Sequence, residues 1–304
     1  MKRIHIVLFS ALFITGLLGC RQDTPVIKDW DAYKREHREW QENRMERLQS
    51  ETGWLNLAGL FWLEEGINTF GSDSANRLVF PRAFPGDCGA LVLHDGRVTL
   101  RVNYGVPITA NGKPVSEMRL KNDQQEETTR LDYEQFRWFI IRRGDRFAVR
   151  LRNLEHPRLD ELDSIPAFPV KEKWVVPADF EAFEEPRTIK VPTVIEGFTE
   201  SYTAPGELHF TIEGDSFSLL PFTSGDGYFL IFGDATNGID TYGAGRFLYI
   251  PDAKRDRILI DFNKAYNPPC AFSPHATCPL PPAENYIDFP VTAGEKTVHP
   301  GIPH

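Results

Sequence analysis

The sequence lacks any run of basic residues, and its 43 Asp and Glu outnumber its 34 Lys and Arg. A net charge of −9 argues against nucleic acid as a partner, because that partner requires clustered cations. The chain also has no Gly-x-Ser-x-Gly elbow, no His-Glu-x-x-His zinc motif and no Walker phosphate loop. We therefore predict no cofactor and no metal, and none of the hydrolase or nucleotide-binding classes that those motifs mark.

Long apolar stretches are absent after residue 20. Before it, Lys2 and Arg3 precede an almost wholly apolar run over residues 4–18, which Gly19 and Cys20 close. The run is short for a membrane span and has the charged, apolar, small order of a signal peptide. The small residue directly before the cysteine resembles the lipobox of bacterial lipoproteins. The resemblance implies cleavage before Cys20 and acyl chains, such as palmitate, that anchor the protein to a membrane.

The residues after the cysteine, Arg21 and Gln22, differ from an Asp-led signal for retention in the inner membrane. We therefore expect a lipid-anchored protein of the cell envelope, at the outer membrane. A plain secretion signal or an uncleaved anchor is the alternative. Removal of twenty of the 304 residues leaves 284, enough for one large core or two modest ones.

Helical periodicity is confined to about residues 29–51, where aromatic and leucine side chains fall near one face and charged residues elsewhere. After Gly53, short alternating or β-branched runs are separated by turn dipeptides such as Asp95-Gly96 and Gly144-Asp145. The pattern predicts a mainly β protein, an antiparallel β-sandwich or partly closed barrel with an N-terminal amphipathic helix outside it.

The domain organisation predicted from these patterns has three parts. They are a lipoprotein signal peptide (1–20), a tether and N-terminal helix (21–52) and an all-β domain (53–304). A Pro- and acid-rich connection near 155–186 is the expected seam between two halves of the β domain.

One stretch of the β region is reminiscent of forkhead-associated phosphopeptide readers. It runs from Gly71-Ser72-Asp73 to the turn Asn111-Gly112. Ser72 stands where that fold has an Arg after the glycine, so the likeness extends to a sandwich topology and not to function.

Three segments and a short tail carry a wider resemblance: GWLNLAGLFWLEEGINTFGSD (53–73), FGDATNGIDTYGAGRFLYI (232–250), DFNKAYNPPCAFSPHATCPLPPAEN (261–285) and AGEK (293–296). Together they resemble domain of unknown function 1684, a bacterial and archaeal family. No activity is assigned to that family, so the resemblance implies no catalytic residue. The family often has an aromatic residue at the position of His275, which argues against a metal site that depends on this imidazole.

The cysteines of the Pro-rich loop allow three interpretations. Cys270 and Cys278 form a disulfide or remain buried thiols, bind a metal with His275, or provide a nucleophile with His275 as its base. We favour the disulfide because the expected envelope compartment is oxidising. Cys88 is then a small buried hydrophobic residue.

Two polar segments form the predicted ligand site. Asp234, Tyr242 and Arg246 follow an apolar strand in a glycine-rich stretch, and the Pro-rich loop adds Asp261, Asn263, Asn267 and Asn285. We expect a small molecule or glycan to bind there. The alternative function is a hydrolase that uses Asp234 or Asp261 as base, with Arg246 or Asn263 stabilising charge. Against both stands a purely structural pairing of Arg246 with Asp234 or Asp261.

Overall fold

The computed structural model describes residues 26–251 and 258–298. The predicted signal peptide and Cys20 lie outside the described residues. Among the described helices, none has the length and apolar character needed to cross a membrane.

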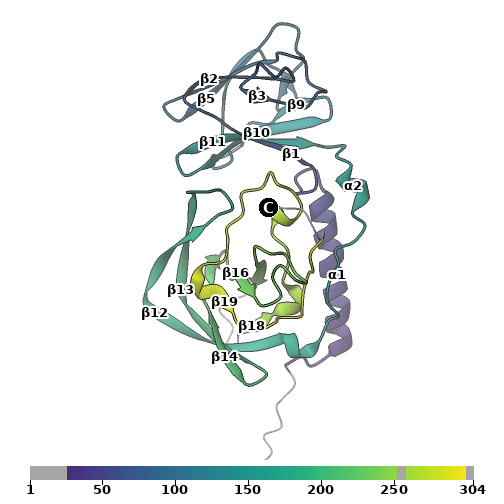
Figure 1. Ribbon diagram of the computed structural model, residues 1–304, viewed down its shortest axis with the longest axis vertical. Coiled ribbons are helices and arrows are strands. Elements are labelled where there is room, and N and C mark those ends of the chain that lie inside the picture. Colours follow the sequence, from purple (N-terminus) through teal and green to yellow (C-terminus); the bar gives the residue numbers. More distant parts are fainter. Residues whose placement is uncertain (1–25, 252–257, 299–304) are drawn as a thin grey trace, which may run out of the picture.

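Two β units lie end to end, and one long helix, α1 (Trp30–Gln49), runs beside the second of them (Figure 1). The N-terminal β unit covers residues 57–153. Its strands are β1 (Leu57–Trp62), β2 (Gly66–Gly71), β3 (Leu78–Val79), β4 (Gly89–His94), β5 (Arg97–Val102), β6 (Thr109–Ala110), β7 (Lys113–Pro114), β8 (Glu117–Leu120), β9 (Leu131–Tyr133), β10 (Phe136–Arg143) and β11 (Arg146–Asn153).

These strands form a six-stranded sheet, ordered β1-β11-β10-β9-β6-β7, and a five-stranded sheet, ordered β3-β2-β4-β5-β8. One core joins the two sheets, because Phe70 and Leu91 from one pack in the same cluster as Trp138 and Val149 from the other. The N-terminal β unit is therefore a sandwich, and its pairings are antiparallel except between β2 and β3.

The connection to the second unit contains α2 (Arg158–Glu161) and the 3-10 turn η1 (Glu172–Trp174). The C-terminal β unit covers residues 172–298. Its elements after η1 are β12 (Val175–Pro192), β13 (Thr199–Ile212), β14 (Asp215–Leu219), β15 (Phe222–Ser224), β16 (Gly227–Asp234), β17 (Arg246–Ile250), β18 (Ile258–Asp261), η2 (Phe262–Lys264), η3 (Pro269–Ala271), η4 (Ala283–Asn285) and β19 (Tyr286–Ile287).

The second unit contains a sheet ordered β14-β13-β12-β18 and another ordered β15-β16-β17, with β19 parallel to β16. Their shared core includes Leu208, Leu230 and Phe262. No sheet closes into a barrel within the described residues, so the fold is mainly β and antiparallel with one N-terminal helix, as predicted.

Within the Pro- and acid-rich connection near 155–186, a strand already begins. β12 starts at Val175, twelve residues before the short run at 187–191 that predicts a strand from the sequence. The early part of this strand carries Pro177 and several acidic residues, and much of it is exposed, so its sequence resembles that of a loop. A bulge between Ala182 and Arg187 interrupts its pairing with β13.

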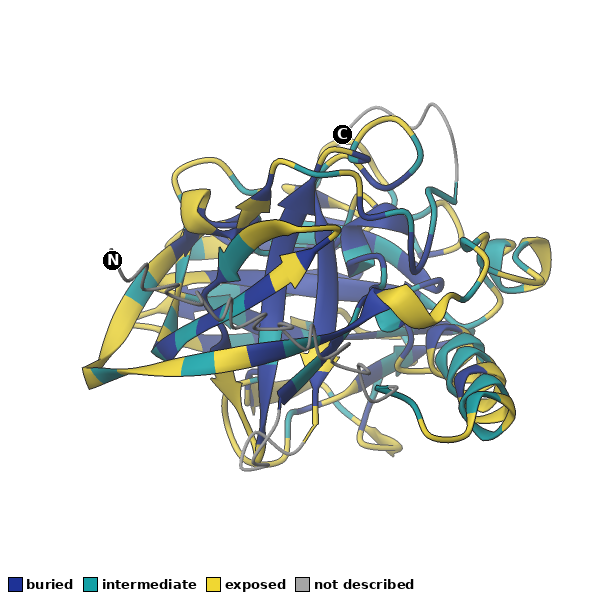
Figure 2. Ribbon diagram, turned by 90° about the horizontal axis from the view of Figure 1, so that it is seen from below, coloured by how far each residue is buried: buried dark blue, intermediate teal, exposed yellow. Residues whose placement is uncertain are grey.

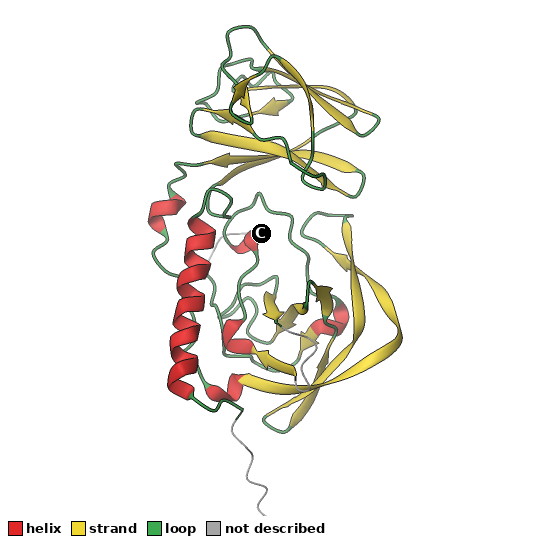
Figure 3. Cartoon of the chain, turned by 180° about the vertical axis from the view of Figure 1, so that it is seen from behind, coloured by secondary structure: helices red, strands yellow, loops and turns green. Residues whose placement is uncertain are grey.

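Helix α1 begins at an N-cap, where the side chain of Asp29 accepts a hydrogen bond from the amide of Ala32. Most of its residues are exposed or half-buried, and only His37 and Leu48 are fully buried (Figure 2). Figure 3 shows it reaching from the far end of the C-terminal β unit to the boundary with the N-terminal one.

Polar contacts attach this helix to the last part of the chain. Tyr33 donates a hydrogen bond to Asp261 at 2.8 Å, and the ring of His37 bonds the carbonyl of Asn263. Arg44 forms an ion pair with Glu295 and donates to the Asn267 carbonyl at 2.8 Å. The helix is thus attached along its length to residues more than 220 positions away in sequence.

Candidate ligand-binding site

The first two predicted site residues form a fully buried ion pair. Arg246 donates from Nη2 to Oδ2 of Asp234 at 2.7 Å, and both side chains are 0% exposed. Arg246 also bonds the carbonyls of Val291 and Ala293, while Asp234 accepts from Thr236. Burial lowers the pKa of Arg246, and the nearby carboxylate partly offsets that effect. The ion pair and its backbone contacts join the C-terminal segment to β16 and β17. The pairing of Arg246 with Asp234 is the structural alternative that the sequence suggested.

Asp261 and Asn263 lie together at the N-terminal end of α1, next to Tyr33. Asp261 accepts from Tyr33 and from Asn263, while Asn263 also bonds the backbone N–H and carbonyl of Lys171. Burial raises the pKa of Asp261, and its hydrogen bonds to Tyr33 and Asn263 and the charge of Lys264 oppose the shift. These contacts hold the helix and the η1 turn together.

The other predicted residues lie apart from these. The side-chain amide of Asn285 bonds the backbone of Leu220 and Ile231, and that of Asn267 donates to the carbonyl of Lys296. Tyr242 is buried in a third cluster with the disulfide loop. The structure therefore does not bring the seven side chains to one pocket. Ligand binding and hydrolysis at the predicted site both require these side chains to face one pocket, and the structure does not place them in that way.

Cys270 and Cys278 are joined in a disulfide, with their Cα atoms 6.1 Å apart. Cys88 is a free, buried thiol, and burial raises its pKa to about 11. A buried neutral thiol is a weak nucleophile. The two bonded cysteines fix the Pro-rich loop at the boundary between the β units, where it contributes to a different pocket.

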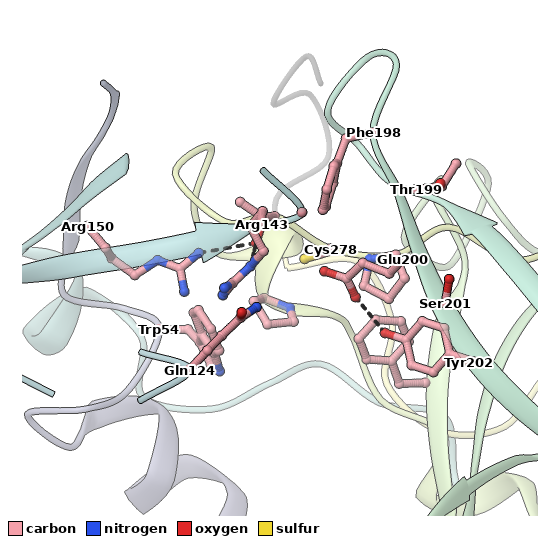
Figure 4. A pocket seen from close by; sticks show the side chains of 15 residues that line it. Trp54, Gln124, Arg143, Arg150, Phe198, Thr199, Glu200, Ser201, Tyr202 and Cys278 are labelled. Atoms are coloured by element: carbon pink, nitrogen blue, oxygen red, sulfur yellow. Dashed lines mark hydrogen bonds between the residues drawn. The ribbon is translucent and has the colours of Figure 1, made fainter. Parts of the chain in front are cut away.

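A cavity of about 660 Å³ opens between the two β units (Figure 4). One wall comes from the N-terminal unit and from Trp54, which precedes its first strand. The other wall comes from the β12–β13 hairpin, the Pro-rich loop and Phe247 of β17. Its lining comprises Trp54, Gln124, Arg143, Gly144, Arg150, Phe198, Thr199, Glu200, Ser201, Tyr202, Phe247, Pro269, Thr277, Cys278 and Pro279. We call it the inter-unit cavity.

Arg150 is the most unusual residue of this lining. It is only 4% exposed, yet no carboxylate among the described residues forms an ion pair with it. One hydrogen bond, from Nη2 to the hydroxyl of Thr277 at 3.2 Å, serves the guanidinium, while its Nε has no partner. Its carbon Cζ lies 5.5 Å from the ring centroid of Trp54. Burial, followed by the charges of Arg143 and Arg152, lowers its pKa to about 10, and the more weakly acting charges of Asp123 and Glu200 oppose the shift.

A second guanidinium lies beside it. Arg143 pairs with Asp123 at 2.7 Å and donates from Nε to Thr277 at 3.3 Å. Across the cavity, Tyr202 donates to Glu200 at 2.8 Å, and burial raises the pKa of that phenol. Thr277 therefore bonds both arginines, and the disulfide at the next residue fixes its position.

This arrangement has the properties of an anion site. Arg150 remains positively charged at neutral pH because its pKa of about 10 is well above 7. A buried cation that no carboxylate contacts directly is costly, and a carboxylate or phosphate entering the cavity would supply that contact. Trp54 offers an aromatic face next to that charge.

Trp54, Arg143 and Arg150 are not among the site residues predicted from the sequence. On β11, Phe147, Val149 and Leu151 alternate with one alanine and three arginines, a pattern that predicts one buried face and one largely solvated face. The apolar residues do enter the core of the N-terminal unit. However, Arg150 bonds Thr277 of the second unit and Arg152 bonds Gly53 and Asn56, and the two arginines are only 4% and 5% exposed. The signal available in the sequence was the placement of two arginines, Arg150 and Arg152, at alternate positions of an otherwise apolar strand.

Comparisons with known proteins place the chain in a family without an assigned activity. An uncharacterized protein of Haloarcula marismortui, solved in solution by NMR, is 32% identical, with 45% of this chain and 78% of that chain covered and a TM-score of 0.39. Two FHA-domain structures match at 16% identity over 31% of this chain and 92% and 97% of theirs, each with a TM-score of 0.22. One comes from a study of phosphothreonine-dependent interactions, and the other is the FhaA domain in complex with an intracellular domain.

The FHA similarities are too low to carry an argument about this chain. A search of functionally curated proteins found no match. Residues 160–296 match the model of a single family, as the sequence motifs predicted. The chain belongs to the family described as protein of unknown function (DUF1684).

Proposed function

We propose that the protein binds a small molecule with an anionic group in the inter-unit cavity. The observation that carries this proposal is the buried guanidinium of Arg150, which has no carboxylate partner among the described residues. Unpaired buried charges destabilise a fold and tend to occur where function requires them. Arg143 adds a second cation, and Trp54 adds a stacking surface.

The same lining favours binding over hydrolysis. It contains no histidine, and its cysteine, Cys278, is in the disulfide. Its carboxylate, Glu200, accepts a hydrogen bond from Tyr202 rather than from a serine or threonine. The described lining thus offers no nucleophile paired with a general base, which acyl transfer of the serine or cysteine type requires.

Removal of the Arg150 charge should abolish binding. The mature chain, made soluble by Cys20→Ala, is screened by thermal shift and calorimetry against phosphate, citrate and sugar acids. An anion at about 100 times its Kd should stabilise the protein by about 2.7 kcal/mol. Arg150→Met should weaken that anion's affinity at least about 100-fold, since a charge-assisted hydrogen bond and the cavity's main cation are lost.

The matched control is Arg146→Met, on the same strand. Arg146 is exposed and stacks on Trp62, away from the cavity, so its loss should leave affinity unchanged. Equal affinities of wild type and Arg150→Met for every anion that binds would contradict the proposal. So would the absence of any stabilising anion.

We also propose that the protein is a lipid-anchored protein of the cell envelope. The support is the sequence of residues 1–20 and the closing Gly19-Cys20. Cells fed radiolabelled palmitate should label the wild-type protein and leave Cys20→Ser unlabelled. Wild-type protein should fractionate with the outer membrane. Equal labelling of both proteins, or wild-type protein found only in soluble fractions, would contradict the anchor.

A further inference from the structure

A second cavity of about 740 Å³ lies on the other side of Trp54. It is bounded by the C-terminal half of α1 and by β16 and β17, and like the inter-unit cavity it is open to solvent. The two cavities share three lining residues, Trp54, Phe247 and Pro269. Each volume alone is typical of small-molecule sites, which span about 300–1,000 Å³. Their shared wall places two adjoining compartments along one surface.

Aromatic side chains dominate the second cavity. Trp40, Tyr249, Tyr266 and Phe272 line it together with the shared Trp54 and Phe247. Tyr249 is 44% exposed, an unusual position for a large side chain within a sheet. Aromatic faces of this kind bind the C–H surfaces of sugar rings or other flat rings.

This cavity also has a buried acceptor without a donor. Asn267 is 1% exposed and lines the cavity, and its Oδ1 has no hydrogen-bond partner among the described residues. The assignment of that oxygen is fixed because Nδ2 of the same amide donates to the Lys296 carbonyl at 2.8 Å. Ser50 and Thr52 add hydroxyl-bearing residues to the lining. Oδ1 of Asn267 is itself shielded from solvent, so the polar groups that a ligand meets in this cavity are the exposed side chains of Arg47, Ser50 and Thr52.

We infer that the two cavities hold one elongated ligand, an acidic oligosaccharide. Its carboxylate lies at Arg150 and its further rings pass Trp54 to stack in the second cavity. This inference rests on the proposed function, because the anionic end uses the inter-unit cavity. Sugar rings combine hydroxyl groups with C–H faces, which matches an aromatic wall that also carries the exposed polar side chains of Arg47, Ser50 and Thr52. Open cavities allow a chain to continue into solvent at either end.

The test compares three saccharides by calorimetry on the mature chain carrying Cys20→Ala. They are galacturonic acid, trigalacturonic acid and the neutral maltotriose. We expect the charged trisaccharide to bind at least about tenfold more tightly than the charged monosaccharide, and at least tenfold more tightly than maltotriose. Arg150→Met should weaken the binding of both acidic sugars.

A second variant isolates the second cavity. Tyr249→Ala should reduce trisaccharide affinity to the level of the monosaccharide and leave monosaccharide affinity unchanged. Tyr104→Ala, an exposed tyrosine of the N-terminal unit that lines neither cavity, is the matched control and should change nothing.

The outcomes separate this inference from the proposal beneath it. If the monosaccharide binds through Arg150 but chain length adds nothing, the elongated ligand is wrong and the anion site stands. The same holds if phosphate or citrate binds while no acidic sugar does, or if Tyr249→Ala leaves trisaccharide affinity intact. If no anion binds at all, the proposed function fails along with the inference.

Discussion

Replacing Asp234 by Ala is expected to lower the free energy of unfolding by about 3–5 kcal/mol. The variant leaves the guanidinium of Arg246 buried at 0% exposure without its counter-ion, and the hydroxyl and amide of Thr236 lose their acceptor. Breaking one side of a buried pair is far more harmful than removing both, because the remaining charge is uncompensated. Urea unfolding followed by circular dichroism measures the loss.

Two controls define what the buried pair contributes. The double variant Asp234→Leu/Arg246→Met should recover much of the lost stability, since no isolated charge remains. Asp240→Ala removes a half-exposed carboxylate that pairs with Lys296 at 3.5 Å, and should cost less than about 1 kcal/mol. A loss below 1 kcal/mol for Asp234→Ala would refute the structural role and reopen a functional one for this pair.

Arg150→Met should have the opposite effect on the free protein, raising its free energy of unfolding. Burial lowers the pKa of Arg150 in the fold to about 10, well below the usual range of a guanidinium. At about 1.4 kcal/mol per unit, burying the charged form costs about 3 kcal/mol at neutral pH. Met retains the apolar part of the side chain and removes that penalty. Stability is then gained by the same substitution that abolishes ligand binding.

The stability difference between Arg150→Met and wild type should depend on pH in a defined direction. Because the folded pKa lies below the unfolded one, the penalty is complete below about pH 10 and is relieved as the pH rises above that value. The advantage of Arg150→Met over wild type should therefore be constant from pH 7 to 9 and shrink at pH 10.5. The similarly lowered pKa of Arg152 is present in both proteins and cancels. A variant less stable than wild type at pH 7 would show that Arg150 is structural.

Local sequence patterns predicted most of the β elements. The short alternating or β-branched runs at residues 97–102 and 246–250 predict strands from the sequence, and β5 and β17 have the same bounds. The hairpin around Gly144 was marked by alternation on both sides of a turn, and β10 pairs with β11 through that turn. β12 was only partly predicted, because its long exposed stretch, rich in Glu and Pro, has no apolar alternation.

The candidate site was not predicted from the sequence, because its residues come together only through the packing of the two β units. Polar residues in a glycine- or proline-rich loop draw attention, yet Asp234 and Asn285 proved to be internal hydrogen-bonding groups of the C-terminal unit. Arg150 sits on a regular strand, and its significance arises only when the second β unit covers that face. The sequence pattern of one strand does not show that a second β unit packs against it. The site at Arg150 could therefore be identified only from the structure.

Helix α1 carries a consequence for the order in which the chain assembles. Its partners, Asp261, Asn263 and Glu295, are synthesised last, more than 220 residues after the helix itself. Contacts of such long separation slow folding, because a large loop must close before they form. The helix cannot dock while the chain is still emerging, and a nascent or C-terminally truncated chain would present Trp30, Tyr33 and His37 uncovered. Completion of the C-terminal segment is thus the step that commits the first helix to its place.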